Sequence, residues 1–270
     1  MPLGVHAPLT LGCENGHRFD ANKRGYLSTI DKGRGINGDS KEILRSRSEF
    51  LALGHYEPIA DLVDDCLPHS PDRDEPADNE LDDELMPRGL RILDSGCGTG
   101  YYLAHLLESR PDASALALDA SADAVAMTVA ATGASGLVAD VWQPSAVRDD
   151  TADVVLCIFA PRNAAEFTRV LSPGGRLIVV TPRENHLAEL RETGEMIGIQ
   201  PDKLTALDAG LSAEFDLVDR QSIVYERSLD LVARALVAAM GPSGHHERQQ
   251  PTTGGTITIA VDVSVYAPHS

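Results

Sequence analysis

From residue 91 onward, short apolar runs alternate with segments that have helical spacing. The apolar runs are RILDSG, ALALDAS, GLVAD, DVVLCIFA and GGRLIVVTP. Helical patterns such as YYLAHLLES and ADAVAMTVAA separate them. Short buried runs joined through helices predict parallel strands with helices on both faces of the sheet. The late segment TITIAVDVSVYA predicts a last strand. We therefore expect an α/β fold with a mostly parallel sheet and a C-terminal antiparallel hairpin.

The first 88 residues have a different pattern. Residues 1–38 are rich in turn-forming residues, which predicts a small hairpin module. Residues 39–88 predict two linker helices, interrupted near Gly54 and Pro58, and then a Pro-rich acidic loop. We expect the main domain to occupy residues 89–270.

Composition narrows the range of partners. The chain contains 23 Lys and Arg against 41 Asp and Glu, a formal net charge of -18. Proteins that bind nucleic-acid backbones usually present a basic surface, so this acidity disfavours such a partner. No stretch reaches the ~18 apolar residues that span a bilayer, and we expect a cytoplasmic protein with no membrane partner. The four cysteines form no CxxC pair, and Cys97 and Cys157 are predicted to be buried, inert thiols.

A glycine-rich turn follows the first strand of the main domain. The segment LDSGCGTG places Asp94 at the end of the strand and then Gly96, Gly98 and Gly100 in the turn into the next helix. Glycines adopt backbone torsions that are closed to other residues, and they let a ligand approach the main chain. Because dinucleotide-binding proteins share such turns, this one predicts only a nucleotide-like ligand.

Two further acids narrow the identity of that ligand. Asp119 ends the next strand, about twenty residues on, where a carboxylate can accept hydrogen bonds from both ribose hydroxyls. Asp140 follows a third strand, where it suits an adenine amino group, and Val141 beside it can pack on the ring. Each acid alone could be a solvated turn residue, but a dehydrogenase needs no third acid. Together they predict S-adenosylmethionine as the cofactor.

The acceptor is expected at the end of the fourth strand, in IFAPRN. Methyl transfer from a sulfonium is an in-line displacement, so the enzyme must hold the acceptor atom and let its proton leave. We predict that Asn163 bonds to the edge of a heterocycle, and that Tyr101 or Phe159, which also faces the cofactor, stacks on it. His186 is predicted to be a general base, with the orientation of a helix as the alternative. The remaining predicted acceptor contacts are Pro161 and Arg162.

Over nearly its whole length the chain resembles the large-subunit rRNA guanine-N1 methyltransferases, a family that includes macrolide-resistance enzymes. The matching segments are CENGHRFDANKRGYL, FLALGHYEPI, LDSGCGTGYYLAHLL, ADVW, FAPRN, TPRENHLAEL and AMGPS. This resemblance implies a class I (Rossmann-like) methyltransferase fold and methyl transfer to a nitrogen heterocycle. By position in the family it also implies Arg47 as a clamp on the methionine carboxylate of the cofactor, and Tyr26 as a substrate contact.

The resemblance breaks at the N-terminus. Family members begin with a zinc ribbon, but here Cys13 and His17 remain without the preceding CxxC pair, so residues 1–38 are a degenerate ribbon for which we expect no metal. This loss and the acidity narrowly favour a small-molecule methyltransferase of secondary metabolism, acting on an indole- or purine-like ring. The alternative is 23S rRNA guanine-N1 methylation that confers macrolide resistance, which FAPRN and TPRENHL favour. A homodimer is compatible with both.

Overall fold

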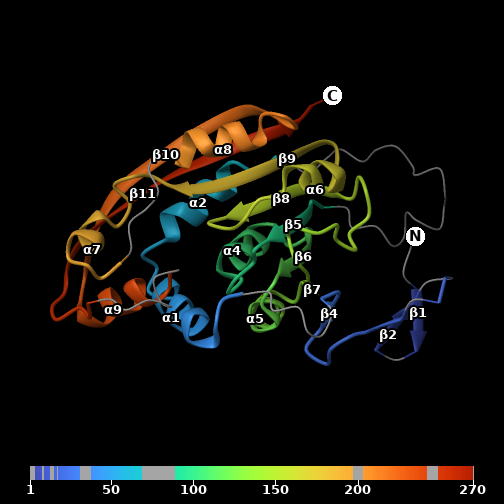
Figure 1. The fold of residues 1–270 in the computed structure, drawn as a ribbon, viewed down its shortest axis with the longest axis horizontal. Coiled ribbons are helices and arrows are strands. Elements are labelled where there is room, and N and C mark those ends of the chain that lie inside the picture. Colours follow the sequence, from blue (N-terminus) through green and yellow to red (C-terminus); the bar gives the residue numbers. More distant parts are fainter. Residues whose placement is uncertain are drawn as a thin grey trace.

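The computed structural model describes residues 4–7, 9–12, 15–16, 18–30, 38–68, 89–196, 203–241 and 249–269. Its central feature is an eight-stranded sheet with the order β10-β11-β9-β8-β5-β6-β7-β4 (Figure 1). In that order the strands are β10 (Phe215–Leu229), β11 (Gly255–Pro268), β9 (Leu171–Pro182), β8 (Ala152–Ile158), β5 (Arg91–Ser95), β6 (Ser114–Asp119), β7 (Ser135–Val138) and β4 (Tyr26–Ser28). A separate antiparallel sheet contains β1 (Gly4–Ala7), β2 (Thr10–Gly12) and β3 (Arg18–Asp20).

The directions of the strands confirm the predicted fold class. The strands from β9 to β4 run parallel, whereas β11 is antiparallel to both β9 and β10. β5 pairs with β6 on one side and with β8 on the other. The order of the strands therefore reverses at β5, and open α/β sheets bind their ligands beyond the carboxyl ends of the strands at such a point.

Helices cover both faces of the large sheet (Figure 1). They are α1 (Lys41–Leu51), α2 (Glu57–Asp65), α4 (Tyr101–Ser109), α5 (Ala122–Thr132), α6 (Ala164–Val170), α7 (Ala188–Glu192), α8 (Lys203–Leu211) and α9 (Leu231–Ala239). On one face, α2, α4 and α9 bury Ile59, Leu103 and Val237 in a large apolar cluster. On the other face, α6 and α8 bury Phe167 and Leu207 in a second cluster.

The strand β8 contributes to both apolar clusters. Every residue of β8 is buried. Val154 and Leu156 belong to the first cluster, and Val155 and Cys157 belong to the second. Because successive side chains of a strand point to opposite faces, a strand covered on both faces needs a continuous apolar run. The Cys157 thiol is fully buried as predicted, and burial raises its pKa to about 12.

Two helices, α1 and α2, lie where the sequence predicts linker helices, and residues 69–88 of the predicted acidic loop lie outside the described residues. Ser40 caps α1, because its hydroxyl accepts a hydrogen bond of 3.4 Å from the amide of Ile43. Gly54, with a φ of +74°, lies in the turn between the helices, and Pro58 lies in the first turn of α2. β4 falls within residues 1–38 yet pairs with β7, so the boundary at residue 38 stays a prediction. Among the described helices, none is long and apolar enough to cross a membrane.

Candidate cofactor and acceptor site

The glycine turn after β5 is held tightly against its surroundings. The amides of Gly96 and Cys97 both donate to the carbonyl of Leu118 at the end of β6. Gly96 and Gly100 have φ values of +85° and +78°, in the left-handed region that favours glycine. A Cβ on Gly96 would lie 2.4 Å from the Cβ of Ala160, and one on Gly100 would lie 2.9 Å from the Cα of Thr128. Only glycine fits these two positions.

Asp119 faces this turn from the end of β6. Its Oδ2 accepts a hydrogen bond of 3.1 Å from the amide of Gly98, and its Oδ1 accepts one of 2.8 Å from the amide of Ser121. Burial raises the pKa of Asp119, and these two backbone hydrogen bonds oppose that rise. Each carboxylate oxygen keeps a second lone pair. The geometry therefore fits the predicted role of accepting hydrogen bonds from ribose hydroxyls.

Asp94 places a second carboxyl group beside the first. It is only 3% exposed, and burial together with the nearby charge of Asp119 raises its pKa to about 7. Two acids in adjacent strands repel each other when both are ionised. A cationic group bound near them would relieve that repulsion. The pair therefore suits a cofactor that carries a sulfonium and an ammonium, as S-adenosylmethionine does.

Arg47 reaches the same turn from α1. A Cβ on Gly98 would lie 3.5 Å from its Nη1, so the guanidinium lies beside the turn where a clamp would have to be. That Nη1 donates to Oδ2 of Asp39 at 2.5 Å, and Nη2 donates to the carbonyl of Met240 at 2.7 Å. Sequence reasoning missed these two partners, because neither shares a recognisable motif with Arg47.

The loop after β7 holds the predicted adenine contacts. Oδ1 of Asp140 accepts a hydrogen bond of 3.0 Å from the amide of Trp142, whose side chain is 62% exposed. Nδ2 of Asn163 donates to the carbonyl of Val141 at 2.8 Å, and its Oδ1 accepts from the amide of Glu166 at the start of α6. Asn163 thus joins the adenine-side loop to α6. Its predicted contact with an acceptor stays a prediction.

Four side chains form an aromatic cluster at the carboxyl end of β8, defined as Tyr56, Tyr102, Phe159 and His186. The ring of Phe159 lies nearly parallel to that of His186, with centroids 6.0 Å apart and an interplanar angle of 21°. Tyr56 and Tyr102 contact Phe159 at centroid distances of 6.4 and 6.5 Å. Phe159 is 40% exposed, and the next residue, Ala160, lies against Gly96. An accessible aromatic ring therefore lies beside the cofactor turn.

His186 is bonded at both ring nitrogens. Nδ1 accepts a hydrogen bond of 3.2 Å from the amide of Ala260, and Nε2 lies 3.2 Å from the hydroxyl of Tyr56. An accepting Nδ1 places the proton of a neutral ring on Nε2, which then donates to Tyr56. The side chain is also 7% exposed. These contacts join His186 to β11 and to the aromatic cluster, and both predicted roles, the general base and the orientation of a helix, stay predictions.

The other predicted substrate contacts are dispersed. Pro161 and Arg162 follow Phe159 in the same loop, and Pro161 is exposed. Tyr101 begins α4 and packs edge-on against Tyr102, and burial raises its pKa to about 12. Tyr26 pairs with Gly136 at the amino-terminal end of β7. Because ligands bind at the opposite, carboxyl ends of these strands, Tyr26 lies apart from the other predicted residues.

Metal binding was expected to be absent. Within the described residues, no three His, Cys, Asp or Glu lie close enough together to hold a metal ion. Cys13 and His17, which remain of the ribbon pattern, lie outside the described residues. The expectation for the N-terminal module therefore stays a prediction.

Comparison with known proteins connects this site to a family. Residues 92–175 match the family described as a methyltransferase domain. A 23S rRNA (guanine(748)-N(1))-methyltransferase of Streptomyces fradiae is 35% identical over 88% of this chain and 81% of its own length. A putative 23S rRNA (guanine-N(1)-)-methyltransferase of Micromonospora griseorubida is 33% identical over 97% of this chain and 91% of its own length. The chain belongs to the 23S rRNA guanine-N1 methyltransferase family.

Membership of this family confirms that the protein is an S-adenosylmethionine-dependent methyltransferase. A chain from the solved complex of the Haloferax volcanii Trm112 methyltransferase activator with a putative methyltransferase has a TM-score of 0.51. It is 19% identical and covers 86% of this chain and 100% of its own length, which shows the shared fold. The narrow preference for a small-molecule acceptor finds no support among these relatives, whose names agree with the rRNA alternative.

Proposed function

We propose that the protein transfers the methyl group of S-adenosylmethionine to N1 of a guanine in 23S rRNA. Two relatives with that activity in their names match this chain over most of its length. The structural observation that carries the proposal is the accessible ring of Phe159 beside the cofactor turn. Enzymes that modify a base in RNA must take it out of its stack and hold it on another flat surface. Phe159 offers such a surface.

The residues of the chain have to position the base. When bound, S-adenosylmethionine supplies an electrophilic methyl group on its sulfonium. The guanine would have to lie with N1 in line with the bond between that methyl group and sulfur. As the N–C bond formed, the C–S bond would break with its electron pair left on sulfur, and the N1 proton would pass to solvent. Stacking on Phe159 fixes the plane of the base, and the parallel ring of His186 fixes Phe159 from behind. We assign His186 the role of a positioning residue.

One observation favours a different acceptor. The net charge of -18 makes contact with a polyanion unfavourable over much of the surface, and it would not hinder a small neutral heterocycle. The two possible acceptors lead to different expected results in one methylation assay. The assay therefore includes both acceptors.

The protein is incubated with methyl-labelled S-adenosylmethionine and either unmodified 23S rRNA or a mixture of small heterocycles that includes free guanine and indole. Because methylation of N1 blocks the Watson–Crick edge, reverse transcriptase should stop at one guanine of the treated RNA. Label in the small heterocycles alone, without such a stop, would overturn the proposal.

Phe159→Ala tests the stacking surface. Base stacking on an aromatic ring is worth ~1–3 kcal/mol, so kcat/KM for RNA should fall roughly 5- to 150-fold. Affinity for S-adenosylmethionine, measured by calorimetry, should stay within about twofold of wild type. The matched variant Phe159→Tyr keeps the ring and should keep the activity. A loss of cofactor affinity in Phe159→Ala would instead place the ring on the cofactor, which is the other contact that the sequence predicts for it.

A further inference from the structure

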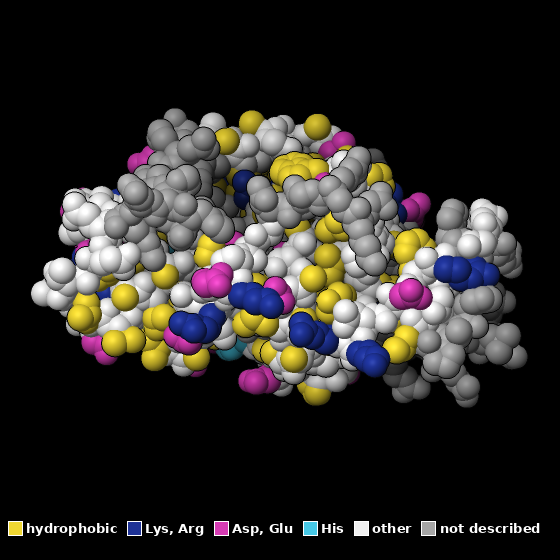
Figure 2. Space-filling model, turned by 60° about the horizontal axis from the view of Figure 1, so that its bottom comes forward, with side chains coloured by type: hydrophobic (Ala, Val, Ile, Leu, Met, Phe, Trp, Pro, Cys, Tyr) yellow, Lys and Arg dark blue, Asp and Glu magenta, His cyan; other side chains and the backbone are white. Residues whose placement is uncertain are grey.

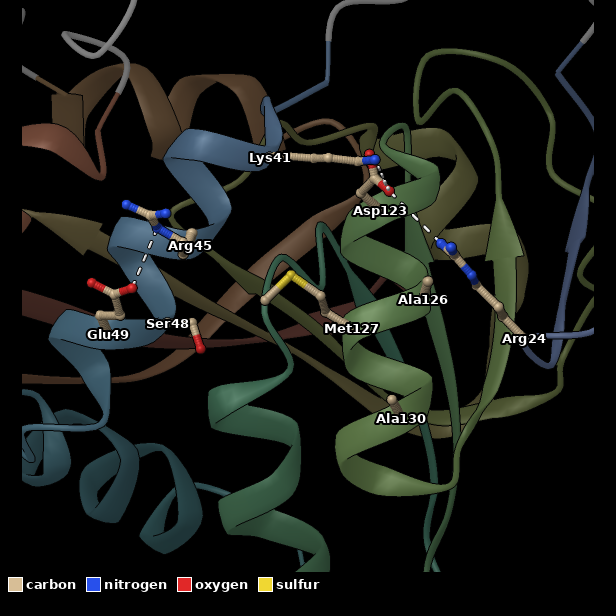
Figure 3. A pocket seen from close by; sticks show the side chains of 9 residues that line it. All are labelled: Arg24, Lys41, Arg45, Ser48, Glu49, Asp123, Ala126, Met127 and Ala130. Atoms are coloured by element: carbon tan, nitrogen blue, oxygen red, sulfur yellow. Dashed lines mark ion pairs between the residues drawn. The ribbon is translucent and has the colours of Figure 1, made fainter.

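A hollow of about 690 Å³ lies between α1, α5 and the turn before β4 (Figure 3). The helix α1 contributes Lys41, Arg45 and Ser48, whose spacing places them on one stripe. The helix α5 contributes a stripe that begins with Asp123 and continues with apolar residues as far as Ala130. No residue of the predicted cofactor set lines this hollow, so the site already described does not account for it.

Three cations surround the hollow and are only loosely held. The side chains of Arg24, Lys41 and Arg45 are 65%, 73% and 80% exposed. Arg24 and Lys41 share one acid, Asp123, at 3.9 and 3.7 Å, and Arg45 lies 3.3 Å from Glu49. Exposed ion pairs of this kind stabilise a protein by only ~0–1 kcal/mol. An anionic ligand can therefore replace these partners at little energetic cost.

The charge is unevenly distributed along the sequence, and the segment that includes α1 and the turn before β4 is its less acidic part. Residues 1–53 contain eight of the 23 Lys and Arg but only six of the 41 Asp and Glu. The face that carries α1 and α5, at the bottom of Figure 1, shows a row of Lys and Arg side chains with a few acids among them (Figure 2). A polyanion that is repelled by the rest of the protein can approach here.

The hollow also lies next to the cofactor site. The hydroxyl of Ser121, which caps α5, donates to the carbonyl of Asp39 at 3.1 Å and so holds the start of α1 beside the start of α5. Asp119, the predicted ribose acid, lies two residues before Ser121. Lys41 and Asp123 therefore mark the end of the hollow that adjoins the cofactor turn.

We propose that this hollow binds the phosphate backbone of the RNA that carries the target guanine, with Arg24, Lys41 and Arg45 each contacting phosphate. This inference rests on the proposed function, because it takes rRNA as the substrate. Lysine and arginine that contact phosphates release condensed counterions, which makes the affinity fall with salt. The hollow thus supplies affinity that does not depend on sequence, while the aromatic cluster holds the base.

The test compares two triple variants of equal charge. Arg24→Gln/Lys41→Gln/Arg45→Gln removes the cations of the hollow, and Arg148→Gln/Arg176→Gln/Arg227→Gln removes three arginines from other elements. The probe is a 23S rRNA transcript that spans position 748, the guanine in the name of the Streptomyces fradiae relative. Its dissociation constant is measured from 50 to 300 mM NaCl, alongside calorimetry with S-adenosylmethionine and the methylation assay.

The hollow variant should bind RNA roughly 100-fold more weakly at 0.1 M salt, with a salt slope reduced by about 2 to 3, at unchanged cofactor affinity. The control variant should show a clearly smaller loss. Equal losses in both variants, or none in the hollow variant while wild type methylates the transcript, would overturn the inference and leave the proposed function intact. A wild type that neither binds nor methylates the transcript, yet binds S-adenosylmethionine, would overturn both.

Discussion

The amide of Gly98 donates a hydrogen bond of 3.1 Å to the carboxylate of Asp119, which joins the turn after β5 to the end of β6. Asp119→Asn replaces one acceptor oxygen by a donor, so it disturbs this bond or a contact with the ribose. Hydrogen bonds to a charged group are worth ~1.5–3 kcal/mol, which predicts roughly 10- to 100-fold weaker binding of S-adenosylmethionine. Calorimetry measures the change, and the exposed Asp112→Asn is the control. Unchanged affinity in Asp119→Asn would contradict the cofactor assignment.

The buried carboxyl of Asp94 predicts a pH-dependent stability. Its pKa is raised from the ordinary 3.8 to about 7 by burial and by Asp119. Between these values the folded protein keeps the proton and the unfolded chain releases it. The free energy of unfolding therefore falls by up to about 1.4 kcal/mol for each pH unit over this range.

Asp94→Asn cannot ionise and should escape this loss. Its melting temperature without cofactor should rise relative to that of wild type as the pH goes from 5 to 8. Asp153 is the contrasting control, because burial alone would raise its pKa but the hydrogen bonds from Arg91 lower it. Asp153→Asn should be destabilising across the same range. If the melting temperatures of Asp94→Asn and wild type change in parallel from pH 5 to 8, Asp94 does not titrate in this pH range.

Two glycines with similar torsions separate strain from steric conflict. Gly133, which ends α5, has a φ of +70°, and a Cβ at this position would meet no other atom within 4 Å. Gly133→Ala should therefore cost only ~1 kcal/mol. Gly100→Ala adds a clash with the backbone of Thr128 and should cost clearly more. Urea unfolding gives both values, and equal costs would mean that the glycine turn has room to move.

The two tyrosines of the aromatic cluster, buried Tyr56 and half-buried Tyr102, differ in hydrogen bonding. The Tyr56 hydroxyl lies 3.2 Å from His186, whereas the Tyr102 hydroxyl is buried with no hydrogen-bond partner among the described residues. Tyr56→Phe should therefore lower the free energy of unfolding by ~1–2 kcal/mol, and Tyr102→Phe should leave it unchanged or raise it. If His186 orients the cluster, Tyr56→Phe should also lower kcat for RNA without moving the pH profile. A shifted pH profile would restore His186 as the general base.

Local pattern was enough to predict the sheet and the positions of two acids at the ends of its strands. The run in β8 and the strand-end positions of Asp94 and Asp119 follow from the period of side chains along a strand, which any short window reveals. The roles of Asn163 and His186 depend instead on partners 22 and 130 residues away, Val141 and Tyr56. Such contacts form only once the chain is folded, so an exposed functional side chain and a structural one look alike in the sequence.

Charge shows the same limit in another way. The net charge of -18 predicted repulsion of RNA. A net charge does not show where on the folded protein the positive and negative side chains lie. Folding gathers Lys41 and Arg45 on one stripe of α1 and brings Arg24 from a distant turn to face them. The distribution, and not the total, decides where a polyanion can bind.

Phe159 has a φ of +54°, a torsion that a non-glycine residue adopts at a cost of roughly 1–2 kcal/mol. Its amide still donates to the carbonyl of Val180, so neighbouring strands hold the residue in that shape. Selection for folding alone would favour glycine at this position, since glycine accepts the torsion freely. Phe159 has an aromatic ring at this strained position. The residue that would be best for stability therefore differs here from the residue that would be best for activity.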